Sequence, residues 1–114
     1  KIFVIGNKAI GTSSNKLDLA KKEFDQILNT NFTNEDLMNL MQSPQESYDF
    51  DQKKLSENHG NEFSARFINS LIYGTRSTTV MTIDKNNHIE IKEQLYDQNG
   101  KIGQEKEFKF KVSL

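Results

Sequence analysis

One stretch, TRSTTVMTIDKNNHIEIKEQLYDQNGKIGQEKEFKFKV at residues 75–112, decides the fold of this chain. It holds three runs rich in β-branched and aromatic residues, separated by the polar segments DKNNH and DQNGK. The Asn-Gly pair in the second segment is a strong hairpin signal. In the last run Phe108 and Phe110 alternate with lysines, which is typical of a strand with one wet face and one buried face. The sequence therefore predicts a three-stranded antiparallel meander over residues 75–83, 88–96 and 105–112.

The first of these strands carries apolar side chains on both faces. Because successive side chains of a strand alternate, Val80 points to one side while Met81 and Ile83 point to the other. This pattern indicates a sheet that is covered twice, by helices on one face and by a further layer on the other.

Two amphipathic helices are expected before the meander. Apolar residues recur at helical spacing over NKLDLAKKEFDQILN, residues 15–29, and a shorter helix is expected within NFTNEDLMNLMQS, residues 31–43. Thr33 is a suitable N-cap for the second helix, Leu37, Leu40 and Met41 form its apolar face, and Pro44 ends it. Two further segments are expected, a β-hairpin over residues 2–12 and a long polar loop over residues 45–62.

Helices followed by a run of antiparallel strands give an α+β fold, with the two helices on one face of the sheet. The chain has 114 residues and a hydrophobic content of 34%, which stays below the roughly 45–50% of ordinary globular chains even when its 6 glycines are added, as that range requires. A single segment of this size and composition builds only a thin core. The chain opens on Lys1 and runs directly into an apolar stretch, which suggests a piece processed or excised from a longer protein.

Composition excludes several function classes. The formal net charge is −1, so no overall field attracts nucleic acid or an anionic membrane surface. There is no Cys, which rules out disulfides, thiolate metal sites and a Cys nucleophile on this chain. The two histidines have no partners at metal-binding spacing, and neither a metal nor a cofactor is expected. No apolar run is long enough to span a bilayer and the start does not read as a signal peptide, so we expect a cytoplasmic protein.

The stretch YGTRSTTVMTID, residues 73–84, resembles the C-terminal signature of the NRDE family, also called transport and Golgi organisation 2. Members of that family show Tyr-Gly-Thr-Arg-Ser-Ser-Thr-Val, an Asp before the turn, and a Glu-Arg pair on the next strand. Glu93 matches the Glu, whereas Gln94 stands where Arg is usual. Upstream, IGTSSNKLD at residues 10–18 is similar to the family's Gly-Leu-Ser-Asn segment, with Asn15 as the matching Asn.

The family resembles N-terminal nucleophile (Ntn) hydrolases, which form a four-layer αββα sandwich and attack an amide carbonyl with an N-terminal Cys. This chain begins with Lys1, contains no Cys and lacks the Asn-Arg-Asp-Glu segment. The resemblance therefore implies the C-terminal half of a sandwich, inactive as this fragment. The other half of the same protein, or self-association, would cover its outer sheet face.

The resemblance implies that the parent is an amide or acyl hydrolase, or a protein that handles acyl groups, lipid or haem. Its ligand would be an acyl or amide small molecule. The alternative is a small non-catalytic α+β protein-interaction module.

Four residues are candidates for the site. Arg76 either binds a substrate carboxylate, phosphate or acyl oxygen, or pairs with Glu93 or another carboxylate across the sheet. Tyr73 either lines a pocket or belongs to the core. Asn15 either donates to an oxyanion, as an Asn does in distantly related acylases, or caps the helix that it precedes. Arg66, in SARF, matches a segment that supplies an active-site Arg in bile salt hydrolases.

Overall fold

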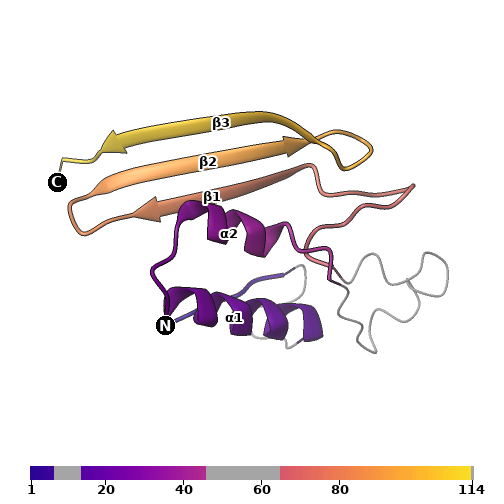
Figure 1. Ribbon diagram of the computed structural model, residues 1–114, viewed down its shortest axis with the longest axis horizontal. Coiled ribbons are helices and arrows are strands. Elements are labelled where there is room, and N and C mark those ends of the chain that lie inside the picture. The colour runs from indigo at the N-terminus through magenta and orange to yellow at the C-terminus, as the bar shows by residue number, and fades with distance from the viewer. Residues whose placement is uncertain (7–13, 46–64, 114) are drawn as a thin grey trace.

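The computed structural model describes residues 1–6, 14–45 and 65–113 and shows an α+β fold, as predicted. Its elements in chain order are α1 (Asn15–Leu28), α2 (Asn34–Met41), β1 (Ser77–Ile83), β2 (His88–Tyr96) and β3 (Ile102–Lys111). The strands form one antiparallel sheet in the order β1-β2-β3, which confirms the meander (Figure 1).

Both turns of the meander lie where the sequence places them. In the first, Asn87 has a φ of 63°, and Asp84 Oδ1 accepts the backbone N–H of His88 at 3.0 Å. In the second, Gly100 has a φ of 75°, a left-handed conformation that glycine adopts without strain. Strand β3 begins at residue 102, three residues earlier than predicted. The register of β2 and β3 shifts between Gln94 and Tyr96, and pairing resumes at Ile102. A shift of this kind interrupts the alternation on which the prediction depends.

Both helices begin at hydrogen-bonded caps. Thr33 caps α2 with a capping box, in which its side chain accepts the backbone N–H of Asp36 and the Asp36 carboxylate accepts the backbone N–H of Thr33. The Thr33 prediction is confirmed. Helix α1 is capped by Ser14, whose hydroxyl accepts the backbone N–H of Leu17 at 3.2 Å. Asn15 is therefore the first helical residue, and the prediction that it caps α1 is wrong.

The core is thin. Helix α2 packs against β1, and α1 packs against α2 (Figure 1). The buried apolar residues in the described part of the chain are Met38, Ala65, Val80 and Tyr96. Met38 is 2% exposed, whereas the predicted core residue Met41 is 43% exposed. The helical spacing does not indicate which of these two methionines is buried, because residues three apart lie on the same face of a helix.

The outer face of the sheet, turned away from α2, is apolar and open. The register places Met81, Ile91 and Phe108 side by side across the three strands, and Ile83, Ile89 and Phe110 in the next row. Met81 and Ile83 are each 60% exposed. Phe108 and Phe110 are 56% and 48% exposed. We call these six residues the outer apolar patch. Its position agrees with the prediction that β1 is apolar on both sides.

Residues 1–6 belong to no strand, so the first half of the predicted hairpin is not formed. Phe3 and Ile5 are exposed. Without a neighbouring strand, the backbone N–H and C=O groups of this segment have no inter-strand hydrogen-bond partners. The second half of the hairpin, and the predicted 45–62 loop apart from Gln45, lie outside the described residues. In the part of the chain that the structure describes, no helix is both long and apolar enough to cross a membrane.

Candidate functional site

The signature residues lie in a loop at one end of the sheet. A hollow of about 750 Å³, which we call the loop hollow, is lined by Arg66, by residues 68–77 and by Asp97, Gln98 and Gly100 of the β2–β3 turn. Helix α1 begins at the same end of the molecule (Figure 1). Three of the four predicted site residues, Arg66, Tyr73 and Arg76, line this hollow, and the fourth, Asn15, is the first residue of α1.

Short-range hydrogen bonds give this loop a defined shape. Asn69 and Gly74 form an isolated antiparallel bridge, and the backbone N–H of Thr75 donates to the Ile68 carbonyl at 2.8 Å. The Ile68 N–H in turn donates to the Thr75 hydroxyl at 2.9 Å. A Cβ at position 74 would lie 3.3 Å from the Ile68 carbonyl oxygen, so the Gly of YGTR allows this close approach.

The β2–β3 turn packs against the same loop. A Cβ on Gly100 would lie 2.7 Å from the side-chain Cγ of Asn69, so any other residue would have to displace the Asn69 side chain. The Asn-Gly pair that predicts the hairpin therefore also brings Asp97 and Gln98 to the wall of the hollow.

Tyr96 connects the loop to the rest of the fold. Its hydroxyl accepts from Gln42 Nε2 at 2.8 Å and donates to Thr78 Oγ1 at 2.9 Å. Its ring meets Phe67 edge-on with centroids 4.8 Å apart, and its backbone N–H donates to the Arg76 carbonyl at 2.9 Å. Through its side chain and its backbone, this one buried residue thus connects the end of α2 and the start of β1 to both ends of the loop.

Arg76 and Tyr73 both line the loop hollow. Arg76 is exposed, and no carboxylate within the described ranges pairs with its guanidinium. The predicted pairing with Glu93 is wrong, because Glu93 lies opposite Thr79, three residues further along β1. Tyr73 is 61% exposed, so the alternative that placed it in the core is also wrong.

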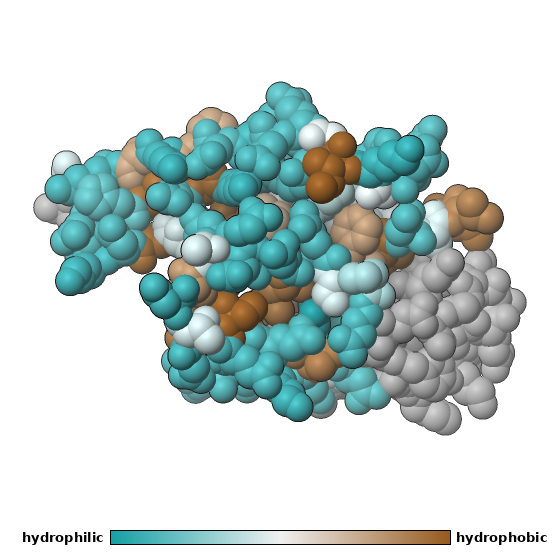
Figure 2. Space-filling view, in the orientation of Figure 1, coloured by the Kyte–Doolittle hydropathy of each residue, from teal (hydrophilic) through white to brown (hydrophobic). Residues whose placement is uncertain are grey.

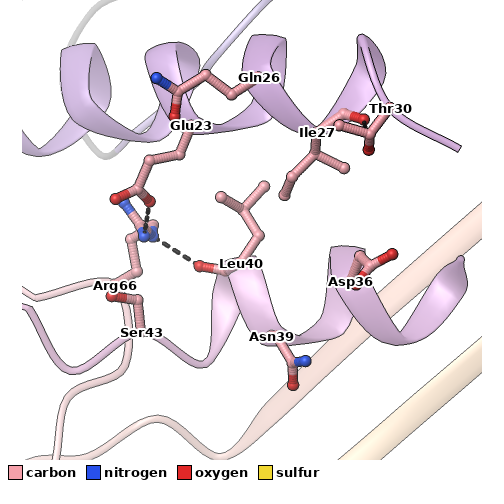
Figure 3. A pocket seen from close by; sticks show the side chains of 9 residues that line it. All are labelled: Glu23, Gln26, Ile27, Thr30, Asp36, Asn39, Leu40, Ser43 and Arg66. Carbon is pink, nitrogen blue, oxygen red and sulfur yellow. Dashed lines mark hydrogen bonds and ion pairs between the residues drawn. The ribbon is translucent and has the colours of Figure 1, made fainter. Parts of the chain in front are cut away.

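Arg66 is held by neighbouring elements. Its side chain is 7% exposed, its guanidinium forms an ion pair with Glu23 of α1, and its Nε donates to the Leu40 carbonyl of α2 at 2.7 Å (Figure 3). These groups border a second hollow of about 560 Å³ between the helices, which we call the helix hollow. Burial, and secondly the charge of Arg66, lower the pKa of Lys16 below its ordinary value, so the guanidinium also acts on the first turn of α1. In this geometry Arg66 joins the two helices.

Gln94 stands where the resemblance predicts an Arg, and it is 5% exposed. Its Nε2 donates to the Leu95 and Gly103 carbonyls at 3.0 and 3.1 Å. The amide therefore satisfies backbone oxygens where the β2–β3 register shifts. An arginine would bring a positive charge into this buried position, so the substitution fits the local backbone.

Asp97 adds a fixed negative charge to the hollow. Its Oδ1 accepts the backbone N–H groups of Lys101 at 2.9 Å and Asn99 at 2.8 Å. These hydrogen bonds, that from Lys101 first, lower the pKa of Asp97 below its ordinary value. The hollow therefore presents a cation at Arg76 and an anion at Asp97.

Comparison with protein-family models tests the family membership that the signature residues suggest. The model of the family described as transport and Golgi organisation 2 matches residues 1–98. The chain belongs to this family. The match includes both helices, the signature loop and strand β2, and it ends in the β2–β3 turn, before β3. No curated protein matches the chain.

Sequence reasoning missed Tyr96, Asp97 and Gly100 as parts of the site. Tyr96 looked like the last residue of a strand, and the other two looked like ordinary turn residues. Their roles depend on the approach of the turn to residue 69, which lies about thirty residues earlier in the chain. For Gly100, the Asn-Gly signal was present, but it indicates a turn and not what the turn touches.

Proposed function

We propose that the loop hollow is a ligand site of an NRDE-type, Ntn-hydrolase-like protein. In this proposal Arg76 binds the carboxylate, phosphate or acyl oxygen of an acyl or amide small molecule. The main support for the proposal is the position of Arg76, whose exposed guanidinium lies at the wall of a 750 Å³ hollow. In the described part of the chain it has no carboxylate partner. A guanidinium presents a planar fork of N–H donors that matches such oxygens.

The rest of the hollow suits an amphipathic ligand. Leu71, Ile72 and Tyr73 line it and are 106%, 72% and 61% exposed. Figure 2 shows hydrophobic atoms projecting at the end of the molecule where this loop lies. An acyl chain placed along these residues would put its polar end within reach of Arg76, which is the arrangement expected of small-molecule sites with few polar anchors.

The reaction proposed for the parent is hydrolysis of an amide or acyl bond. The non-catalytic alternative is that the same site binds acyl groups, lipid or haem. Asn15, at the start of α1, is the proposed donor to the oxyanion. The thiol nucleophile must come from outside these 114 residues, since they contain no Cys. Arg66 is a weaker candidate for the site, because its Nη2 and Nε are already bound to Glu23 and to the Leu40 carbonyl.

Calorimetric titration with N-dodecanoylglycine, which combines an acyl chain, an amide and a carboxylate, tests this proposal. We expect binding to the chain and at least a tenfold loss of affinity in Arg76→Ala. Lys85→Ala, an exposed cation in the turn at the other end of the sheet, serves as the matched control and should bind normally. Dodecanamide, which lacks the carboxylate but keeps the acyl oxygen, should lose less affinity in Arg76→Ala than N-dodecanoylglycine does. Equal affinity of Arg76→Ala and the control for N-dodecanoylglycine would contradict the role given to Arg76.

The outer apolar patch favours a second candidate function, an interaction module. Four of its side chains together expose roughly 400 Å² of apolar surface, the size of the largest apolar patch on a typical monomer, which is often a functional surface. We propose that the apolar face of a second β-sheet covers it, as in an αββα sandwich. The patch should bind the dye 8-anilinonaphthalene-1-sulfonate. A Met81→Gln, Phe108→Gln variant should lose most of that signal, while Leu28→Gln, at the exposed end of α1, keeps it. Unchanged dye fluorescence in the double variant would remove this proposal.

A further inference from the structure

Strand β3 has a free edge. It pairs with β2 on one side, and no other described segment lies along its other side (Figure 1). All ten of its residues, Ile102–Lys111, are exposed. A long edge strand of this kind presents unpaired backbone N–H and C=O groups to any strand of suitable sequence.

The side chains of β3 carry an ordered charge pattern on the face that α2 partly covers. Glu107 lies opposite Lys92, which lies opposite the buried Val80, so Glu107 is on the helix side of the sheet. Along that side the sequence reads Glu105, Glu107, Lys109, Lys111. Two acidic residues are thus followed by two basic residues at strand spacing, while Phe108 and Phe110 occupy the opposite face.

We propose that β3 pairs antiparallel with β3 of a second copy of this chain, with the two Phe108 residues opposite each other at the two-fold axis. In this register Glu107 of each copy lies opposite Lys109 of the other. Glu105 likewise lies opposite Lys111, which gives four Glu–Lys cross-strand pairs. Lys106 lies opposite Phe110, where its ammonium can approach the ring face.

Neighbouring registers are less favourable. A shift of the axis to Glu107 places the two Glu107 carboxylates opposite each other, and a shift to Lys109 does the same with two ammonium groups. Parallel in-register pairing would place every charge opposite its own copy, which is destabilising. The sequence therefore specifies one antiparallel register, and opposite-charge pairs set both partner and orientation.

The groups required are accessible. The Glu105, Glu107 and Lys109 side chains are 44%, 47% and 63% exposed. Within the chain Glu107 contacts Lys109 at 3.1 Å and Glu105 contacts Lys92 at 3.5 Å. These surface contacts are exposed to water and can rearrange at little cost.

Pairing through the edge also extends the outer apolar patch. The row Met81, Ile91, Phe108 would continue across the axis into the same row of the partner, giving a six-stranded sheet with a continuous apolar band on one face. Strand β3 lies beyond residue 98, where the family match ends, so the inference concerns this chain and is independent of the ligand proposal.

Two charge variants test the proposal by sedimentation equilibrium of the whole chain. Glu105→Lys with Glu107→Lys makes the helix side of β3 entirely basic, and Lys109→Glu with Lys111→Glu makes it entirely acidic. We expect the unmodified chain to form a dimer. Each variant alone should dimerise at least about 30-fold more weakly, because four attractive pairs become repulsive. An equimolar mixture of the two variants should form a mixed dimer, since the acidic and basic strands are complementary.

The mixture distinguishes weakened edge pairing from misfolding. Each chain carries the same substitutions in the mixture as it does alone, so a misfolded variant would fail to associate in both. Far-UV circular dichroism of each variant checks the fold directly. A dimer that instead stacks through the outer apolar patch would not respond to these charges, since they lie on the other face. A chain that stays monomeric at millimolar concentration, a dimer insensitive to the substitutions, or a mixture that fails to associate would each overturn the proposal.

Discussion

Substitution of Arg66 distinguishes a residue that joins the helices from one that serves the site. Arg66→Met keeps the apolar stem but removes the ion pair with Glu23 and the hydrogen bond to the Leu40 carbonyl. Breaking a fully buried pair costs about 3–5 kcal/mol. The Glu23 side chain is 28% exposed and regains some hydration, so we expect a loss of about 2–3 kcal/mol in the free energy of unfolding.

Urea unfolding of a double-mutant cycle measures this loss and its origin. Glu23→Gln and Arg66→Met together should cost less than the sum of the single losses by at least about 1 kcal/mol. Lys22→Met, an exposed cation of the same helix, is the control and should change stability by less than about 0.5 kcal/mol. A cost below about 0.5 kcal/mol for Arg66→Met, or strictly additive losses, would refute the structural role and return Arg66 to the list of site residues.

Three further predictions follow from local contacts. Thr33→Ala removes the capping box of α2 and should lower the free energy of unfolding by about 1 kcal/mol, measured by urea titration; no loss would mean that the cap is unimportant. Tyr96→Phe keeps the ring but leaves buried polar partners unpaired, so we expect a loss of about 1–2 kcal/mol together with faster hydrogen exchange at the Thr75 amide; unchanged exchange would show that the hydroxyl does not hold the loop. The backbone N–H groups of His88 and Lys101 are the chief causes that lower the pKa values of Asp84 and Asp97 in the folded chain. Both carboxylates therefore stabilise the fold above the unfolded pKa of about 3.9, and this stabilisation is lost as pH falls through the folded pKa values. The urea midpoint should therefore drop as pH falls below about 4, and Asp97→Asn should flatten that drop; a midpoint independent of pH would contradict it.

Much of the fold was predictable because local chemistry and periodicity agreed. The meander follows from alternating apolar residues and an Asn-Gly turn, and the start of α2 follows from Thr33 with acidic residues after it. The cap of α1 was assigned one residue too late, because Ser14 and Asn15 are both good caps and only the backbone conformation separates them.

The site was less predictable because its contacts join distant segments. The resemblance drew attention to Tyr73 and Arg76, but the pairing partner of Arg76 depended on strand register, and a three-residue offset removed Glu93. The position of Tyr96 among Gln42, Phe67 and Thr78 depends on tertiary packing that no single-sequence pattern encodes. The ion pair of Arg66 with Glu23 likewise joins residues separated by more than forty positions.

If the signature loop and the β2–β3 turn form one ligand site around Arg76, heteronuclear NMR of the chain titrated with N-dodecanoylglycine should locate the ligand there. We expect chemical-shift changes to concentrate at residues 66–77 and 97–100 and at the Arg76 side-chain Nε–H. Changes confined to the outer sheet face, or to the helix hollow between α1 and α2, would contradict it.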